Sequence, residues 1–249
     1  MESVPEAADQ AALSFDAVSY SYGDAAILQK VSLIIHRREF VGIIGPNGGG
    51  KTTLLKLAMG LLTPSQGCIR LFGIAPKDAI LKVGYVPQAV HFDRQFPISV
   101  EELVLGGRLS QLPWYGRFSR SDRIAARRAL ERVGMLEYAH RPLSALSGGQ
   151  AQRALFARAL ATPKLELLLL DEPTTNIDSK GEEDIYALLQ QLRNEVTMVM
   201  VTHNLQTAIS YFDRVICVHR HVAALSPEQV CEHFALGLYH SPLTGALDI

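Results

Sequence analysis

The sequence lacks the features that mark a secreted or membrane-spanning protein. It has only three cysteines in 249 residues, and their odd number and wide spacing favour a reducing, cytoplasmic compartment over a disulfide framework; they are Cys68, Cys217 and Cys231. The longest apolar runs, such as residues 167–170, fall far short of the roughly 20 residues that a transmembrane helix needs. The acidic N-terminus has no signal-peptide pattern, and we expect residues 1–13 to be disordered.

A large excess of either charge is also absent. The formal net charge is −1 and the pI is about 6.7, so no global basic field points to nucleic acid or to an anionic membrane. One local arginine cluster could suggest nucleic acid, but a solvated helix face explains it better; its members are Arg117, Arg120, Arg123, Arg127 and Arg128. We therefore expect no nucleic-acid partner. The length allows one large domain with a subdomain.

The order of apolar patterns predicts an α/β protein. Alternating residues predict strands at 14–20 and 27–35, and continuous apolar runs predict strands at 40–44, 83–86, 167–170, 196–202 and 215–218. Helical patterns occupy residues 52–59, 121–133, 151–161, 181–192 and 205–211. Continuous apolar strands that alternate with helices indicate a parallel sheet covered on both faces. Only helical signals occur between about residues 89 and 160, so a helical block interrupts this sheet; residues 226–249 give a weak helical signal.

The stretch GPNGGGKTT, which we call the phosphate loop (residues 45–53), follows a predicted strand and opens a predicted helix. It matches the pattern G-x-x-x-x-G-K-[ST], in which bare backbone N–H groups and a helix N-terminus meet phosphate oxygens. In this pattern Lys51 reaches the outer phosphates, the Thr52 hydroxyl binds Mg²⁺ and Thr53 lies near the α-phosphate. The nucleotide-binding residues predicted here are Gly45, Pro46, Asn47, Gly48, Gly49, Gly50, Lys51, Thr52 and Thr53.

Two acidic residues end the most apolar predicted strand, which reads LELLLLDE over residues 165–172. Charges at the end of a buried strand are costly unless they are used. Asp171 is suited to hold Mg²⁺, and Glu172 is suited to polarise the water that attacks a phosphate. Together with the phosphate loop, this pair predicts nucleotide hydrolysis.

A second group of small residues precedes a predicted helix at LSGGQ, which we call the signature segment (residues 146–150). Ser147 can cap the helix, while Gly148 and Gly149 expose backbone N–H groups, so this is a second potential anion site. One chain with one nucleotide loop seldom needs two phosphate sites. A dimer would use both, with each nucleotide between the phosphate loop of one copy and the signature segment of the other.

With these elements in this order, the chain resembles the ATP-binding cassette (ABC) ATPase family over about residues 14–222. The resemblance implies a P-loop NTPase fold with a mainly parallel core sheet, an N-terminal antiparallel β subdomain and an inserted helical subdomain at about residues 89–160. Residues 223–249 form a C-terminal tail of unassigned role. The cofactors it implies are ATP and Mg²⁺.

The resemblance also assigns roles to single residues. Tyr22 stands where the family has an aromatic residue that stacks on adenine, although Tyr20 is an alternative. Gln88 matches the glutamine that binds Mg²⁺ or water and connects to the transport partner. His203 matches the histidine that contacts the γ-phosphate, and Asp178 matches the aspartate that reaches the other protomer's site. In the signature segment, the residues implied in nucleotide binding are Ser147, Gly148, Gly149 and Gln150.

A single cassette without coiled coils favours transport over the alternative class, soluble mechanical ATPases that act on DNA or ribosomes. The segment from Val86 to Val104 and the glycine triplet resemble the zinc/manganese branch of bacterial importers, with siderophore or haem importers as the alternative. This branch implies a homodimer at the cytoplasmic face of the membrane, a separate integral membrane permease and, indirectly, an extracytoplasmic metal-binding protein. The resemblance does not tell which metal is carried.

Two other groups of histidine and cysteine residues could suggest a metal site, but the pattern does not favour one. His219 and His221 form an H-x-H pair at a predicted strand end, and Cys231, Glu232 and His233 are adjacent in the tail. Metal binding is conceivable for such groups, but a solvated strand end and a surface helix are expected instead.

Overall fold

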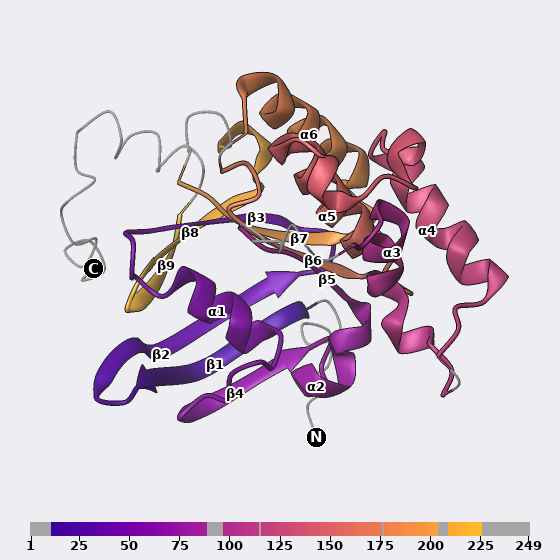
Figure 1. Ribbon diagram of the computed structural model, residues 1–249. Coiled ribbons are helices and arrows are strands. Elements are labelled where there is room, and N and C mark those ends of the chain that lie inside the picture. The colour runs from indigo at the N-terminus through magenta and orange to yellow at the C-terminus, as the bar shows by residue number, and fades with distance from the viewer. Residues whose placement is uncertain (1–10, 89–96, 115, 176, 204–208, 226–249) are drawn as a thin grey trace.

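A computed structural model describes residues 11–88, 97–114, 116–175, 177–203 and 209–225 (Figure 1). Two sheets organise this part of the chain, one of three strands in the order β2-β1-β4 and one of six strands in the order β5-β6-β7-β3-β8-β9. The smaller sheet is antiparallel and consists of β1 (Ala11–Tyr22), β2 (Ala25–His36) and β4 (Gln66–Leu71).

The larger sheet forms the core. Its strands are β3 (Phe40–Ile44), β5 (Val83–Val86), β6 (Leu167–Asp171), β7 (Thr197–Val201), β8 (Arg214–His219) and β9 (His221–Leu225). All pairings are parallel except that of β8 with β9. Every residue of β3, β6 and β7 is buried, which explains their continuous apolar sequences, because both faces of a mainly parallel sheet are covered.

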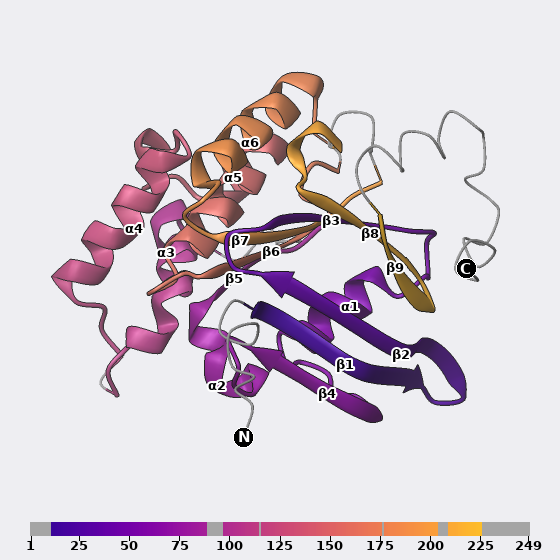
Figure 2. The same ribbon diagram turned by 180° about the vertical axis from the view of Figure 1, so that it is seen from behind.

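The two faces of the core sheet have different covers (Figures 1 and 2). On one face lie α3 (Val100–Leu105), α4 (Arg120–Arg132), α5 (Gly148–Leu160) and α6 (Ser179–Leu192). On the other face, α1 (Lys51–Ala58) lies between the core sheet and the antiparallel sheet, with α2 (Pro76–Ala79) beside β4. Short 3₁₀ helices occupy Ile80–Lys82, Gly106–Gln111, Leu136–Tyr138, Leu143–Ala145 and Ile209–Tyr211.

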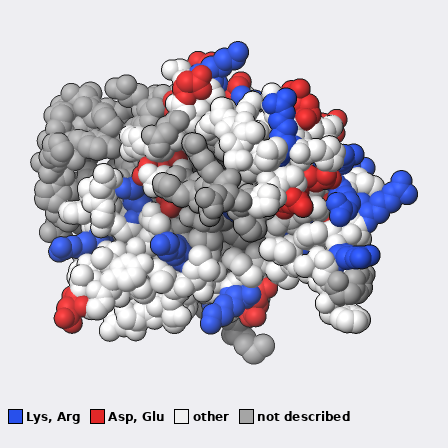
Figure 3. Space-filling model, in the orientation of Figure 1, with Lys and Arg blue, Asp and Glu red and all other residues white. Residues whose placement is uncertain are grey.

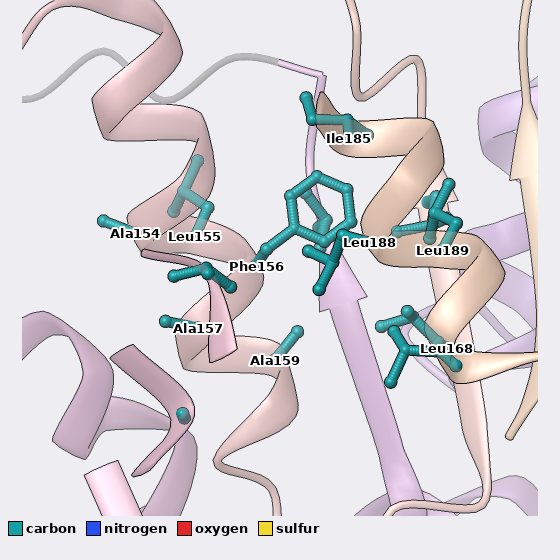
Figure 4. Packing of buried hydrophobic residues seen from close by; sticks show 14 of the residues in the cluster. Ala154, Leu155, Phe156, Ala157, Ala159, Leu168, Ile185, Leu188 and Leu189 are labelled. Atoms are coloured by element: carbon teal, nitrogen blue, oxygen red, sulfur yellow. The ribbon is translucent and has the colours of Figure 1, made fainter. Parts of the chain in front are cut away.

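Two hydrophobic clusters follow from this layering. The first joins α3, α4, α5 and α6 to the core sheet, and Figure 4 shows Phe156 of α5 pointing toward Ile185 and Leu188 of α6. The second fills the space between the core sheet, α1 and the antiparallel sheet, and Leu169 of β6 belongs to it while its neighbour Leu168 belongs to the first. Alternate residues of β6 thus face opposite layers, as the period of a strand requires.

Helices α3 and α4 both begin with a capping box. In α3 the Ser99 hydroxyl accepts from the backbone N–H of Glu102, and in α4 Ser119 and Asp122 make the equivalent pair. The arginines of α4 gather with acidic groups beside them (Figure 3). For example, Arg127 Nε lies 3.3 Å from Glu101 Oε1, so ion pairs within the protein account for part of this cluster.

The structure corrects several sequence-based boundaries. Strand β1 begins at Ala11, so residues 11–13, which we expected to be disordered, belong to the antiparallel sheet. Strand β4 was not predicted, and neither was β9, which continues past the predicted domain end at residue 222. Of the helix predicted at 205–211, residues 209–211 form a 3₁₀ turn and residues 205–208 lie outside the described residues. Residues 1–10 and 226–249 also lie outside them.

Candidate nucleotide-binding site

Three neighbouring strands bring most of the predicted site residues to one edge of the core sheet. Strands β6, β7 and β3 are adjacent and parallel, so their carboxyl ends lie at the same edge. The phosphate loop follows β3, Asp171 and Glu172 end β6, and His203 follows β7. Ligands of open α/β sheets bind outside the carboxyl ends of the strands, so this edge is the expected binding position.

The phosphate loop packs closely against the end of β8. A Cβ atom at Gly45 would lie 2.1 Å from the Val218 carbonyl oxygen, and Gly45 has a φ of +147°, which favours glycine. A Cβ atom at Gly49 would lie 2.8 Å from the same oxygen and 3.0 Å from the Pro46 oxygen. The middle glycine of the triplet therefore has a steric reason in this chain, because even a small side chain at position 49 would collide with backbone.

Helix α1 begins without a side-chain cap. Its N-cap residue, Gly50, has a left-handed φ of +103° and makes no side-chain hydrogen bond. The Lys51 side chain is buried, and its Nζ donates hydrogen bonds to the carbonyl oxygens of Gly45 at 2.9 Å and Pro46 at 3.0 Å. The ammonium group thus lies within the loop, where it can meet a phosphate.

Asp171 is a buried carboxylate with a donor on each oxygen. Thr52 Oγ1 donates to Oδ1 at 3.3 Å, and the Tyr85 hydroxyl donates to Oδ2 at 3.4 Å. Burial raises the pKa of Asp171, an effect that the Thr52 hydrogen bond opposes and the neighbouring Glu172 charge reinforces. Burial, with the nearby Asp171 charge, also raises the pKa of Tyr85 to about 12, so Tyr85 remains a donor at neutral pH.

These oxygens fit Mg²⁺. The ion prefers carboxylate and hydroxyl oxygens and is usually held by one or two carboxylates together with substrate phosphates. Asp171 Oδ1 and Thr52 Oγ1 are 3.3 Å apart and lie beside the phosphate loop, and a cation there would compensate the buried charge.

Glu172 is the centre of a second polar cluster. Its Oε2 accepts from Gln88 Nε2 at 2.7 Å and from Thr175 Oγ1 at 3.2 Å, and it lies 3.4 Å from His203 Nδ1. Its backbone has a positive φ of 47°, which is strained for a residue other than glycine, and its N–H donates to the Val201 oxygen on β7. The structure thus brings Gln88, Glu172 and His203 together at this edge; with Lys51 of the phosphate loop, they are the four residues that we predicted to be catalytic.

Tyr22 and Tyr20 form an edge-to-face pair with ring centroids 5.0 Å apart. Tyr20 packs against the second hydrophobic cluster, whereas 48% of Tyr22 is exposed. Of the two, Tyr22 has the ring that is open to stack on a base. The start of β2 passes beside the phosphate loop, because a Cβ atom at Gly50 would lie 2.8 Å from the Leu28 side chain.

The signature segment starts α5 with a capping box of its own. Ser147 Oγ accepts from the Gln150 N–H at 3.3 Å, and Gln150 Oε1 accepts from the Ser147 N–H at 3.0 Å. Helices α3 and α4 close the same motif with the carboxylates of Glu102 and Asp122. A carboxylate neutralises the partial positive charge of a helix N-terminus, and the neutral Gln150 leaves that charge available to an anion.

The signature segment does not share a pocket with the phosphate loop. It lines a separate pocket of about 600 Å³ together with Asp178, which precedes α6, and with Lys180. None of residues 45–53 is among the described residues that line it. Within one chain, the predicted nucleotide residues therefore divide into two groups, which is what a site shared between two copies requires.

A sequence profile described as "ABC transporter" matches residues 28–175, more than half of the chain. The chain belongs to this family, and it is an ATP hydrolase of that type. A "Probable metal transport system ATP-binding protein" of Chlamydia muridarum is 46% identical over 86% of this chain and 91% of its own length. Two Bacillus subtilis proteins are each 38% identical. The manganese transport system protein MntB aligns over 87% of both chains, and the high-affinity zinc uptake protein ZnuC over 84% of this chain and 91% of its own.

Solved structures agree with the fold. The cbiO1 protein of Clostridium perfringens, described as part of the ABC transporter complex cbiONQ, superposes with a TM-score of 0.76 at 27% identity. The match covers 91% of this chain and 93% of that one. The fold predicted from sequence, a mainly parallel core sheet with an antiparallel β subdomain and a helical insertion, is therefore confirmed.

Sequence reasoning missed two polar partners, Tyr85 and Thr175, and the contact of Val218 with the loop. The signal for Tyr85 is the strand register, which only the structure supplies: Tyr85 pairs with Leu169 and so shares a face with Asp171. His219 and His221 pair across the turn from β8 to β9 and are exposed. The described residues contain no group of three or more His, Cys, Asp or Glu side chains that could hold a metal; Cys231, Glu232 and His233 lie outside them. In the same part of the chain, no helix has the length and apolar character to cross a membrane.

Proposed function

We propose that this chain is the ATPase subunit of an ABC importer that drives uptake of zinc or manganese through a separate membrane permease. One observation supports the ATPase assignment most strongly: the phosphate loop, Asp171 and Glu172 lie together at the carboxyl ends of neighbouring parallel strands. The metal is inferred from the names of relatives that align over most of this chain, a manganese transport protein and a zinc uptake protein. The subunit would lie at the cytoplasmic face of the membrane.

The phosphate loop would bind the phosphates of ATP, and Asp171 would bind the Mg²⁺ ion. Two N–H donors of Lys51 are bonded to carbonyl oxygens of the loop, so the third would bind a phosphate oxygen, and α1 would add the partial positive charge of its N-terminus. Asp171 and Thr52 would hold Mg²⁺, with Gln88 as a further oxygen ligand. When bound, the ion neutralises charge on the outer phosphates.

Glu172 is the proposed general base. Three side chains surround the same carboxylate oxygen, so its orientation is fixed before substrate arrives. A carboxylate held in this way can accept a proton from a water that attacks the γ-phosphate. His203, whose side chain is 64% exposed, is free to contact that phosphate.

The separation of the two residue groups supports a head-to-tail homodimer. Each ATP would lie between the phosphate loop of one copy and the signature segment and Asp178 of the other. Closure of the dimer would move both helical subdomains, and the permease attached to them, while hydrolysis would reopen the pair. An extracytoplasmic protein would deliver the metal ion to the permease and would contact this subunit only indirectly.

The substitution Glu172→Gln tests the catalytic assignment. We expect ATP turnover to fall by about 100-fold or more, because a neutral amide cannot accept the proton. ATP binding should be retained, and the stalled protein should elute as a dimer in ATP during size-exclusion chromatography. Glu183→Gln, at an exposed site on α6, is the matched control and should leave turnover unchanged. Turnover near the wild-type value in Glu172→Gln would show that another group is the base.

The transported ion needs a separate test. In a strain that lacks the gene, uptake of radioactive manganese or zinc should be lost. The wild-type gene should restore it and the Glu172→Gln variant should not. Undiminished uptake of both metals would contradict the metal assignment and leave the ATPase assignment intact.

A further inference from the structure

The carboxylate of Asp171 is held from two sides. Thr52, on α1, donates to Oδ1, and Tyr85, on β5, donates to Oδ2. Thr52 belongs to the predicted metal site, but no motif includes Tyr85. Each oxygen thus has one hydroxyl donor, and the two donor residues, Thr52 and Tyr85, are more than 30 residues apart along the chain.

The strand register explains why Tyr85 reaches this carboxylate. Strands β5 and β6 are parallel neighbours, and Tyr85 pairs with Leu169. Asp171 is two residues beyond Leu169 and therefore points to the same face of the sheet. That face is the one covered by α1, and Tyr85 packs there against the second hydrophobic cluster. The phenol ring is long enough to span the diagonal from Tyr85 to Asp171.

The backbone of Tyr85 is itself fixed by α5. Its carbonyl oxygen accepts a hydrogen bond from an Arg158 terminal nitrogen at 3.2 Å. At the preceding residue, a Cβ atom on Gly84 would lie 2.9 Å from the Ala159 carbonyl oxygen, so α5 and β5 are in direct backbone contact there. Tyr85 consequently has little freedom to leave Asp171.

We propose that Tyr85 is a positioning residue for the metal site: it holds Asp171 Oδ2 so that Oδ1 remains beside Thr52 for the ion. This rests on the proposed role of Asp171 as a metal ligand. Tyr85 does not touch the reacting atoms. It acts only through Asp171, as the outer partners of metal-bound carboxylates do.

The variant Tyr85→Phe tests this inference because it removes the hydroxyl and keeps the ring. Binding of Mn²⁺, used as a paramagnetic probe with a non-hydrolysable ATP analogue, would be followed by electron paramagnetic resonance. We expect the dissociation constant for Mn²⁺ to rise about 10-fold, a usual loss when an outer partner of a metal ligand is removed. Affinity for the same analogue in EDTA should not change. The Mg²⁺ concentration for half-maximal ATP turnover should rise by a similar factor.

Two further variants separate the possible outcomes. Tyr211→Phe removes a hydroxyl from a ring that stacks on Tyr186, and it should leave Mn²⁺ binding unchanged. Asp171→Asn should abolish Mn²⁺ binding. If Asp171→Asn abolishes it while Tyr85→Phe binds Mn²⁺ like the wild type, the positioning role is overturned and the proposed metal site stands. If Asp171→Asn also binds Mn²⁺ normally, the proposed metal site is wrong. Equal thermal unfolding midpoints for wild type and Tyr85→Phe would exclude a general loss of structure.

Discussion

Helices α1 and α5 both begin at glycine-rich segments that we assign to phosphate, yet their first turns are built in different ways. Helix α1 starts after Gly50, which is left-handed, buried and without a side-chain cap. Helix α5 starts after Ser147, which is extended and exposed and closes a capping box with Gln150. Gly49 is also packed tightly on backbone, whereas a Cβ atom at Gly149 would meet only Ile177, at 3.8 Å.

The start of α1 has backbone N–H groups that no side chain caps, whereas the start of α5 is capped by its own residues. At α1, the burial of Gly49 and Gly50 leaves no room for a capping side chain, and phosphate can take that place. At α5, Ser147 and Gln150 already satisfy N–H groups of the helix start, and the segment lies open in a separate pocket. An exposed, self-capped helix start suits a surface that meets its ligand only when a second copy arrives.

The largest expected effect comes from Lys51→Ala. This change removes the ammonium group from the α1 start, and we expect ATP affinity to fall by about 100-fold, equivalent to about 3 kcal/mol. Equilibrium binding of a fluorescent ATP analogue would measure it. Lys56→Ala, on the same helix, should bind like the wild type. If Lys51→Ala binds ATP with unchanged affinity, the assignment of the loop and the comparison with α5 both fail.

The next effect concerns packing. Gly49→Ala should destabilise the protein by about 1–3 kcal/mol, because the new methyl group collides with the oxygens of Val218 and Pro46. Gly149→Ala should leave the free energy of unfolding unchanged or raise it by up to about 1 kcal/mol, since alanine favours a helix. Urea unfolding of both variants gives the comparison. Equal losses of stability would mean that the two helix starts are equally constrained.

The start of α4, which is capped by Asp122, should make a contribution to stability that depends on pH. Hydrogen bonds from Ser119, and then the Arg108 guanidinium 2.6 Å away, lower the pKa of Asp122 below its usual value. A lowered folded-state pKa adds stability above the unfolded pKa of about 3.9, and this stability is lost as the pH falls through the folded-state value. Asp122→Asn should therefore cost about 1–2 kcal/mol at neutral pH.

Urea unfolding at neutral pH and in acid would show this dependence. The difference between Asp122→Asn and wild type should shrink below about pH 4. The exposed Glu137→Gln variant should show no such pH dependence. A difference that stays constant with pH would mean that the Asp122 charge does not stabilise α4.

The smallest effect would come from Gln150→Glu, which gives α5 the charged cap of α3 and α4. We expect the free energy of unfolding to rise by about 0.3–1 kcal/mol, because a carboxylate interacts favourably with a helix N-terminus. ATP turnover should fall, because that carboxylate would repel the phosphate bound by the other copy. Steady-state turnover and urea unfolding on the same preparation would test both signs. A variant that is more stable and equally active would show that the neutral cap has no functional role.

The sequence was sufficient for the elements whose local pattern and tertiary environment agree. Strands β3, β6 and β7 are apolar throughout and buried throughout, so their patterns could be recognised directly. Strand β4 was missed because QGCIRL has a glycine and only two buried residues. Strand β9 was missed because Arg220, at a φ of 62°, makes the turn to it without the glycine or asparagine that usually signals one.

The same contrast holds for the site. The placement of the phosphate loop, Asp171, Glu172 and His203 could be predicted because each ends or follows a strand with a recognisable apolar sequence. Tyr85 could not, because its role depends on the pairing of β5 with β6 and on the length of a ring. The steric need for glycine at position 49 could not be predicted either, because the backbone that excludes a side chain there belongs to β8, far along the chain.

The hydrogen bonds of Lys51 have a further consequence, which concerns the order in which the loop is organised. The ammonium group has three N–H donors, and two of them are bonded to the carbonyl oxygens of Gly45 and Pro46. One donor remains for a phosphate oxygen, so the loop's own backbone can hold the lysine while the lysine holds the nucleotide. The charge therefore has a fixed position that the nucleotide does not have to create, and little side-chain freedom is lost on binding.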